Sequence, residues 1–268
     1  TCICIYTRQI SFRDVTSMIK LTKKVDLTGY TFIVPAVAVG NVAQLAVDLL
    51  IHNAGMTRIG QVFSPDFIPF LGADPYDKAS PELCTTADFY IHEDKRIVAL
   101  QIRSPPVNKL DNFFAKLQEF VKERHISEVI ILTSKWQFVR VDSELRSADL
   151  RYVASPSMEA SHGKKFEELK WSKLNETVDP LSNESRLEIS GGGFALSLFE
   201  FLSKSEICCA ILLKFCSEGN NSPDAKELAV FVNQWISLVP SDNEGRVNWK
   251  EPPSWLHIFG HEPPSEIY

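Results

Sequence analysis

Several features that define other protein classes are missing from this chain of 268 residues. No run of about 18 apolar residues is present, so the sequence contains no candidate membrane span. A basic surplus is missing too, because 28 Lys and Arg stand against 34 Asp and Glu. The resulting formal net charge of −6 argues against a broadly basic nucleic-acid surface. The six cysteines form no C-x-x-C pair, which excludes a zinc knuckle and a thioredoxin-type motif.

Catalytic signatures are equally sparse. The sequence has no G-x-S-x-G elbow, no G-x-x-x-x-G-K-[ST] loop and no H-E-x-x-H motif. Its six histidines follow no metal-ligand spacing. We therefore expect no metal, no cofactor and no enzymatic activity. A disulfide framework is not expected either, because a chain this long and rich in apolar residues needs none, and a reducing compartment fits better.

Two glycine turns leave one alternative open. Gly40-Asn41 follows an apolar run, and Gly191-Gly192-Gly193 precedes an apolar helix. Backbone N–H groups at such turns can bind an anion, which gives the alternative of a phosphorylase- or hydrolase-like enzyme. The structural interpretation is that Asn41 caps a helix and the triple glycine allows close packing or a flexible turn.

What the sequence does contain is the composition of a globular protein, 44% hydrophobic and 23% charged, at the length of one large domain. Apolar runs predict strands over 31–37, 57–63, 88–92, 96–103, 127–134 and 208–215. Periodicity predicts helices over 41–54, 110–121, 164–174, 194–202 and 225–239. Residues 67–71 are predicted to form an irregular segment at the edge of the sheet, and residues 72–82 are predicted to form a loop. This alternation predicts an α/β fold, a three-layer α/β/α sandwich with a largely parallel central sheet.

The helix expected at 41–54 is apolar except for one narrow polar stripe. Its members are Asn41, Gln44, Asp48 and His52, at helical spacing. The stripe is either a thin solvent-facing edge or part of a polar interface. We take Asn41, Gln44 and Asp48 as candidate partner-binding residues.

The two ends of the chain differ from its centre. Arg8, Arg13 and Asp14 interrupt any signal-peptide pattern, and Met18 is a possible natural start. We expect residues 1–27 to be a disordered N-terminal extension and residues 28–268 to be a single domain. Residues 240–268 contain five prolines and form an extended tail that ends in Ile267-Tyr268. An apolar residue, an aromatic ring and a carboxylate together suit capture in a pocket, so both residues are candidates for partner binding.

Several short segments, in order along the chain, resemble the proteasome assembly chaperone family of eukaryotes. They are residues 34–45, 98–104, 145–147, 156–158, 191–193, 212–215, 217–219, 223–225, 253–255 and 259–260. The resemblance extends over roughly residues 28–268 and leaves residues 1–17 outside.

The resemblance implies a chaperone without catalytic activity and an α/β/α fold related to phosphorylase-like enzymes. It implies a heterodimer with proteasome assembly chaperone 1, located in the cytoplasm and nucleus. The pair would bind α-type proteasome subunits, promote formation of the α-ring and hinder off-pathway α-ring dimers. Related chaperones can end in a hydrophobic–tyrosine–any residue motif, whose final residue is absent after Ile267-Tyr268.

Overall fold

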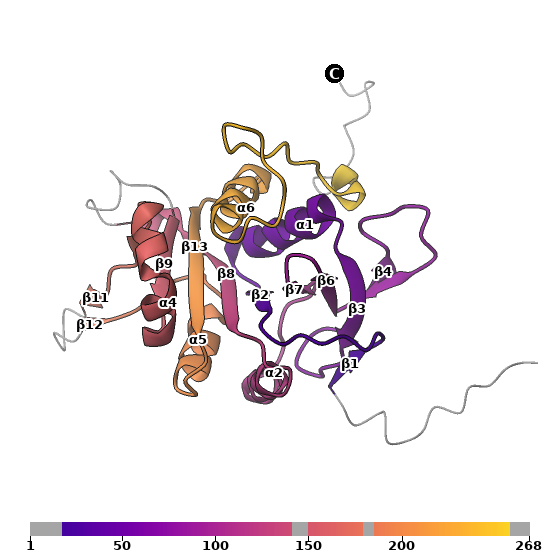
Figure 1. Cartoon of the computed structure of the whole chain (residues 1–268), viewed down its shortest axis with the longest axis horizontal. Coiled ribbons are helices and arrows are strands. Elements are labelled where there is room, and N and C mark those ends of the chain that lie inside the picture. The colour runs from indigo at the N-terminus through magenta and orange to yellow at the C-terminus, as the bar shows by residue number, and fades with distance from the viewer. Residues whose placement is uncertain (1–17, 141–149, 179–184, 258–268) are drawn as a thin grey trace, which may run out of the picture.

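A nine-stranded mixed sheet forms the centre of the molecule (Figure 1). The computed structural model describes residues 18–140, 150–178 and 185–257. In spatial order the strands are β1 (Ile19–Leu21), β3 (Thr57–Val62), β6 (Ala87–His92), β7 (Ile97–Ile102), β2 (Thr31–Pro35), β8 (Glu128–Trp136), β13 (Cys209–Cys216), β9 (Leu150–Ala154) and β10 (Ser172–Lys173). The four central strands β7, β2, β8 and β13 run parallel, and their outer neighbours β6 and β9 are antiparallel. The predicted largely parallel sheet is therefore confirmed at its centre.

The central strands are apolar on both faces because helices cover both. Along β8, Val129 and Ile131 pack into one core cluster, while Ile130 and Leu132 pack into the other. Alternate side chains of a strand point to opposite faces, so a continuous apolar run is what a doubly covered strand requires.

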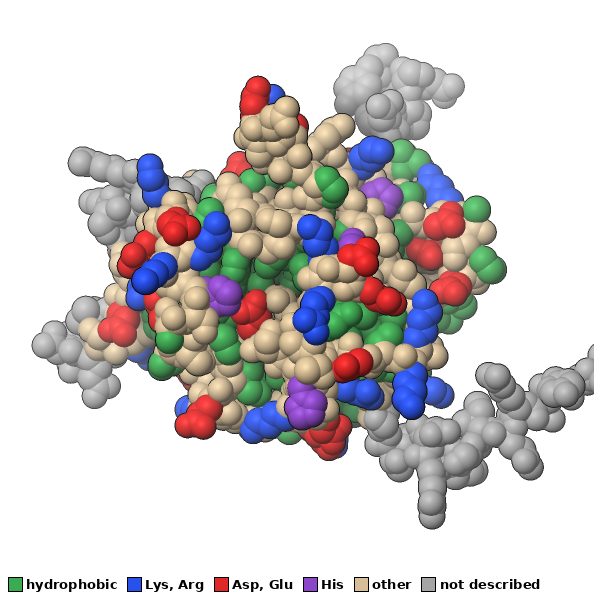
Figure 2. Space-filling model, in the orientation of Figure 1, with side chains coloured by type: hydrophobic (Ala, Val, Ile, Leu, Met, Phe, Trp, Pro, Cys, Tyr) green, Lys and Arg blue, Asp and Glu red, His purple; other side chains and the backbone are tan. Residues whose placement is uncertain are grey.

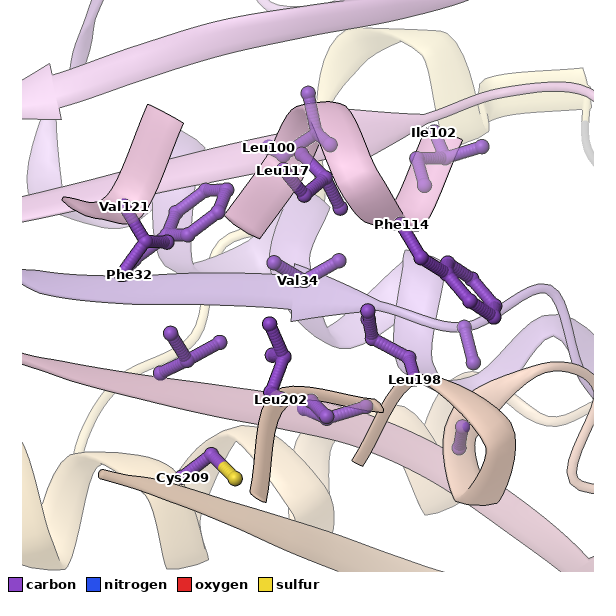
Figure 3. Packing of buried hydrophobic residues seen from close by; sticks show 14 of the residues in the cluster. Phe32, Val34, Leu100, Ile102, Phe114, Leu117, Val121, Leu198, Leu202 and Cys209 are labelled. Atoms are coloured by element: carbon purple, nitrogen blue, oxygen red, sulfur yellow. The ribbon is translucent and has the colours of Figure 1, made fainter. Parts of the chain in front are cut away.

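Five α-helices of the described residues supply the two outer layers. One layer contains α2 (Asp111–Glu123) and α5 (Ala195–Ser203). The other contains α1 (Val42–Ala54), α4 (Pro156–Glu168) and α6 (Ser222–Ile236). Figure 3 shows the first layer against the sheet, with Val34 of β2 between Leu117 of α2 and Leu198 of α5. The predicted three-layer α/β/α sandwich is confirmed. None of the helices in the described ranges is long and apolar enough to cross a membrane.

The described part of the N-terminus belongs to the domain. Strand β1 pairs antiparallel with β3, joining Ile19 to Val62, and Leu27 is fully buried. The expected extension over residues 1–27 is therefore wrong for residues 18–27, because their apolar side chains add to the core beside the sheet edge. Residues 1–17 lie outside the described residues.

One helix is displaced from its prediction, and three strands of the main sheet, β9 and the short edge strands β1 and β10, were not predicted. Helix α4 begins at Pro156, directly after the capping residue Ser155, whereas periodicity placed a helix at 164–174. Strand β9 precedes it and contains the buried Arg151, so its sequence does not read as an apolar strand.

Short elements complete the fold. The two-stranded pairs are β4 (Leu71–Ala73) with β5 (Leu83–Thr85) and β11 (Thr177–Val178) with β12 (Ser185–Arg186). The 3-10 helices are η2 (Val39–Asn41), η3 (Gln137–Val139) and η4 (Pro253–His257). The expected loop at 72–82 is thus flanked by a small ribbon.

Candidate functional site

The structure brings the two glycine turns together at the carboxyl ends of the parallel strands. Gly40 and Asn41 follow β2, and the amide of Val39 donates a 2.9 Å hydrogen bond to the carbonyl of Gly191. The Thr133 hydroxyl of β8 donates to the carbonyl of Gly192 at 2.9 Å. In an open α/β sheet, this edge is where ligands usually bind.

The space between these turns is filled by the chain itself. A Cβ placed on Gly193 would lie 2.0 Å from the Val37 carbonyl oxygen, and one on Gly191 would lie 2.6 Å from the Val39 side chain. Gly40 packs equally closely on Asn221. Glycine is needed here for backbone contact, so the structure supports the packing interpretation of these turns rather than an anion cradle.

The polar stripe of α1 runs from the surface into the interior. Asn41 is exposed at the start of the helix in a left-handed conformation, with φ 52°. Gln44 is half-buried, and its backbone oxygen accepts a hydrogen bond from Gln101. Asp48 is only 6% exposed.

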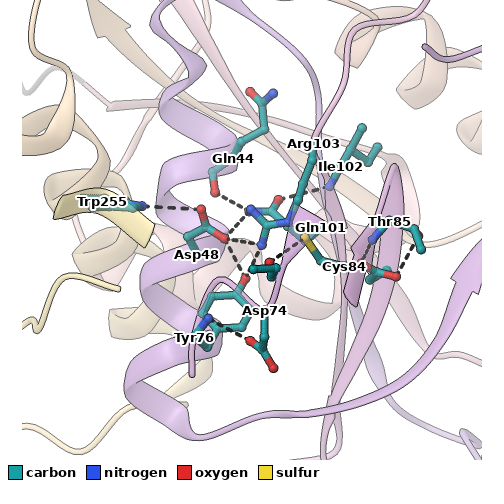
Figure 4. Close-up of polar contacts among 12 residues, drawn as sticks. Gln44, Asp48, Asp74, Tyr76, Cys84, Thr85, Gln101, Ile102, Arg103 and Trp255 are labelled. Atoms are coloured by element: carbon teal, nitrogen blue, oxygen red, sulfur yellow. Dashed lines mark hydrogen bonds and ion pairs between the residues drawn. The ribbon is translucent and has the colours of Figure 1, made fainter. Parts of the chain in front are cut away.

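Asp48 is the centre of a buried hydrogen-bond network (Figure 4). Its Oδ1 accepts from the Tyr76 hydroxyl at 2.6 Å, from Gln101 Nε2 at 2.7 Å and from the Arg103 guanidinium at 2.9 Å. Its Oδ2 accepts from Trp255 Nε1 at 3.5 Å. Both carboxylate oxygens are thus engaged within the chain, so the stripe at Asp48 is neither a solvent-facing edge nor a free partner contact.

Burial and the charge of Asp48 both change the pKa values of its partners. Burial raises the pKa of the Tyr76 hydroxyl well above its usual value, and the nearby Asp48 carboxylate raises it further. Burial alone would lower the pKa of Arg103, but the Asp48 carboxylate raises that pKa above its ordinary value. The network therefore keeps a neutral tyrosine and a charged arginine around the carboxylate. Partner binding by Asn41 and Gln44 stays a prediction, and Ile267 and Tyr268 lie outside the described residues.

The structure also displays an apolar surface that sequence reasoning missed. Six large apolar side chains are exposed around the β4–β5 ribbon and the loops beside it, and we call them the ribbon surface: Phe63, Ile68, Phe70, Leu71, Leu83 and Val107. Leu71 is 66% exposed and Leu83 is 50% exposed. Segment 67–71, an apolar run interrupted by a proline, could have indicated this surface. The other exposed side chains come from other segments of the chain.

The ribbon surface lies beside a cavity of about 220 Å³ with an acidic wall. Asp74, Asp77 and Glu82 line it together with the rings of Tyr76 and Tyr90. No metal-binding group of three or more acidic, histidine or cysteine side chains occurs within the part of the chain that the structure describes. The cavity thus places three carboxylates next to the apolar side chains of the ribbon surface.

Comparison with known proteins identifies relatives along nearly the whole chain. The model of the PAC2 family matches residues 32–238. A Danio rerio protein named Proteasome assembly chaperone 2 is 38% identical over 247 residues, covering 90% of this chain and 95% of the relative. The Homo sapiens protein of the same name is 36% identical over 256 residues, covering 91% and 96%.

Solved structures share the fold at much lower identity. Pyrococcus furiosus PbaA, an archaeal homolog of proteasome-assembly chaperone, superposes with a TM-score of 0.61 at 15% identity, covering 85% of this chain and 89% of that chain. Pyrococcus furiosus PbaB, an archaeal proteasome activator, gives a TM-score of 0.58 at 17% identity, covering 84% and 90%. At these identities the likeness shows a common α/β architecture.

Proposed function

The chain belongs to the PAC2 family, and from this premise we propose that it acts as a proteasome assembly chaperone. The observation that carries the proposal is the match to relatives of that name over about nine-tenths of both chains. The proposal concerns binding of proteasome subunits during assembly, with no catalytic step.

The finer form of the proposal is a heterodimer with proteasome assembly chaperone 1. The pair would hold α-type subunits side by side while the α-ring closes and would hinder off-pathway α-ring dimers. Burial of apolar surface would drive each contact. The exposed apolar side chains of the ribbon surface support a binding role of this kind.

A phosphorylase- or hydrolase-like enzyme is the less favoured alternative. Such an enzyme needs a polar pocket between the two glycine turns, and the glycines there pack on the Val37 backbone and on the side chains of Val39 and Asn221. Because the turns are held together by hydrogen bonds from Val39 and Thr133, an anion would have to displace these contacts to enter.

Affinity purification of the tagged chain from cells, followed by mass spectrometry, tests the proposed function. We expect proteasome assembly chaperone 1 and α-type subunits in the eluate, at levels above those from an unrelated tagged protein of similar size. Recovery of neither would contradict the proposed function. Imaging of the tagged chain tests the proposed location in the cytoplasm and nucleus.

The C-terminal Ile267-Tyr268 pair carries a separate prediction. Removing these two residues should weaken binding of the purified heterodimer to assembled α-rings, because the apolar and the aromatic side chain would be lost together. Binding is measured by titration against α-rings, with Ser265→Ala as a matched tail control. Equal affinity of the truncated and full chains would show that the pair does not dock.

A further inference from the structure

We propose that the ribbon surface is the docking site for the permanent protein partner of this chain, a different chain that is apolar at the centre of its interface and basic at its rim. The inference rests on the proposed function, because the partner is the other subunit of the assembly chaperone. It goes beyond that function by assigning the surface and the chemistry of what covers it.

The backbone under the ribbon surface is rigidly fixed. The Thr86 hydroxyl accepts a hydrogen bond from the amide of Phe70 at 2.9 Å and donates to the carbonyl of Ile68 at 3.2 Å. The Ser104 hydroxyl donates to the same Ile68 carbonyl at 2.7 Å. Exposed apolar side chains on a fixed backbone are already in place for binding, which lowers the entropy cost of docking.

The β4–β5 ribbon turns one apolar face outward. Ala73 pairs with Leu83, and Leu71 pairs with Thr85 two residues along, so the side chains of these four residues share one face. Gly72 and Cys84 point to the other face, where the ring of Phe70 packs closely on Gly72. The outward face therefore offers Leu71 and Leu83 to a partner.

The rim of this surface is acidic. Between Phe63 and Thr86 the accessible acidic side chains are Asp74, Asp77 and Glu82 and the basic one is Lys78, while Asp66 is buried. Figure 2 shows acidic and hydrophobic side chains at the right edge, over the ribbon, with Lys or Arg side chains beside them. The cavity walled by Asp74, Asp77 and Glu82 suits an arginine or lysine side chain of a partner by charge.

The one arginine that lines this cavity is already paired. Arg58 forms an ion pair with the buried Asp88 at 2.6 Å and donates a hydrogen bond to Gln61 at 3.0 Å. It therefore neutralises Asp88 and leaves the three carboxylates of the cavity wall to attract a cation from outside.

The acidic rim argues against a second copy of this chain. In a two-fold symmetric contact the same patch meets itself, so Asp77 and Glu82 would face carboxylates of the other copy. Like charges at an interface oppose association. The chain's own segment 258–268 is disfavoured for the same reason, because its charged side chains include Glu262 and Glu266 and no Lys or Arg.

The apolar content favours a permanent partner over a transiently bound subunit. Interfaces of permanent complexes are more hydrophobic than those of transient ones. Six of the eight large apolar side chains exposed in the described part of the chain belong to the ribbon surface; Leu71 and Leu83 point outward, whereas Phe70 packs on the opposite face at Gly72. We therefore assign it to the chaperone partner and leave the α-type subunits to other, more polar surfaces.

The test measures binding of purified proteasome assembly chaperone 1 to three variants of the full chain. Leu71→Glu with Leu83→Glu should raise Kd at least tenfold, because two carboxylates would be buried against apolar surface. Asp77→Lys with Glu82→Lys should raise Kd about threefold to tenfold and reduce its salt dependence. Phe138→Glu is the matched control, since Phe138 is 79% exposed and lies outside the ribbon surface, and it should bind as the wild type does.

Circular dichroism and thermal melts of each variant separate loss of binding from loss of fold. Equal Kd for all variants and the wild type would overturn the assignment, as would equal weakening by Phe138→Glu. Loss of α-type subunits with the chaperone partner retained would also overturn it. So would a homodimer of the chain alone that dissociates in the Leu71→Glu, Leu83→Glu variant. Failure of the wild type to bind either protein would instead contradict the proposed function.

Discussion

Whether an individual residue is buried or exposed in this protein depends on neighbours that are distant in sequence. Asp48 stands in a polar stripe that suggests exposure, yet Tyr76, Arg103 and Trp255 surround it. Those partners lie 28, 55 and 207 residues away along the chain. Helical spacing identifies the polar face of α1 but carries no information on which distant segment will cover it.

Adding one methyl group at Gly193 is predicted to destabilise the fold. Gly193→Ala places a methyl group 2.0 Å from the Val37 carbonyl oxygen at φ +58°, whereas Gly55→Ala has φ +62° with open space around it. Left-handed backbone alone should lower the free energy of unfolding by about 1–2 kcal/mol in both variants. The clash should cost Gly193→Ala a further amount of about 1–3 kcal/mol. Urea unfolding measures both, and equal losses would contradict the close packing of the two turns.

At the scale of elements, the sequence predicts best where one face or both faces are uniformly apolar. The helices at 41–54 and 110–121 and the strands at 127–134 and 208–215 match α1, α2, β8 and β13 closely. The prediction fails where polar residues are buried or where ends are set by capping. The buried Arg151 makes the sequence of β9 unlike that of an apolar strand. The Ser155 cap places the start of α4 at Pro156, eight residues before the predicted helix. The ribbon surface was not predicted because its residues come from four separate segments of the chain.

The cap of α4 gives a prediction at this scale. The Ser155 hydroxyl accepts hydrogen bonds from the amide of Met158 at 3.3 Å and from the amide of Cys209 in β13 at 3.1 Å. Ser155→Ala should lower the free energy of unfolding by about 2 kcal/mol, because a helix cap is lost and a buried amide is left without its acceptor. Ser161→Ala, at an exposed position of the same helix, should change it by less than about 0.5 kcal/mol. Chemical denaturation of the two variants compares them, and similar values would refute a capping role.

On the scale of the whole molecule, the sheet unites the two halves of the chain. Strands β13 and β9 come from the second half and extend a sheet begun by β2 and β8. Both edges end in short strands, β1 with three residues and β10 with two. Short edges discourage strand-to-strand association, which directs binding to other surfaces such as the ribbon.

Global stability should fall in alkaline solution because of buried phenols. Burial raises the pKa of Tyr90 and of Tyr76 above the ordinary value of 10. Below pH 10 both states hold these protons and the stability is fully present. As the pH rises above 10, the unfolded chain releases protons that the folded chain keeps, so stability is lost by up to about 1.4 kcal/mol per pH unit for each group. Urea unfolding between pH 8 and 11 measures this slope. Tyr90→Phe should reduce the slope above pH 10, and an unchanged slope would mean that this hydroxyl titrates normally in the fold.

The contact between Asp48 and Trp255 also affects the order in which the fold can form during synthesis. The two residues are 207 positions apart, so their hydrogen bond closes one of the longest loops in the chain. During synthesis from the N-terminus, Asp48 can meet Tyr76 and Arg103 early, while Trp255 emerges 152 residues after Arg103. Ser254 then bonds to the Pro75 carbonyl, in the loop that joins the two ribbon strands. The ribbon therefore gains this support late in synthesis, and a shorter nascent chain would expose the ribbon surface without the contacts of Ser254 and Trp255.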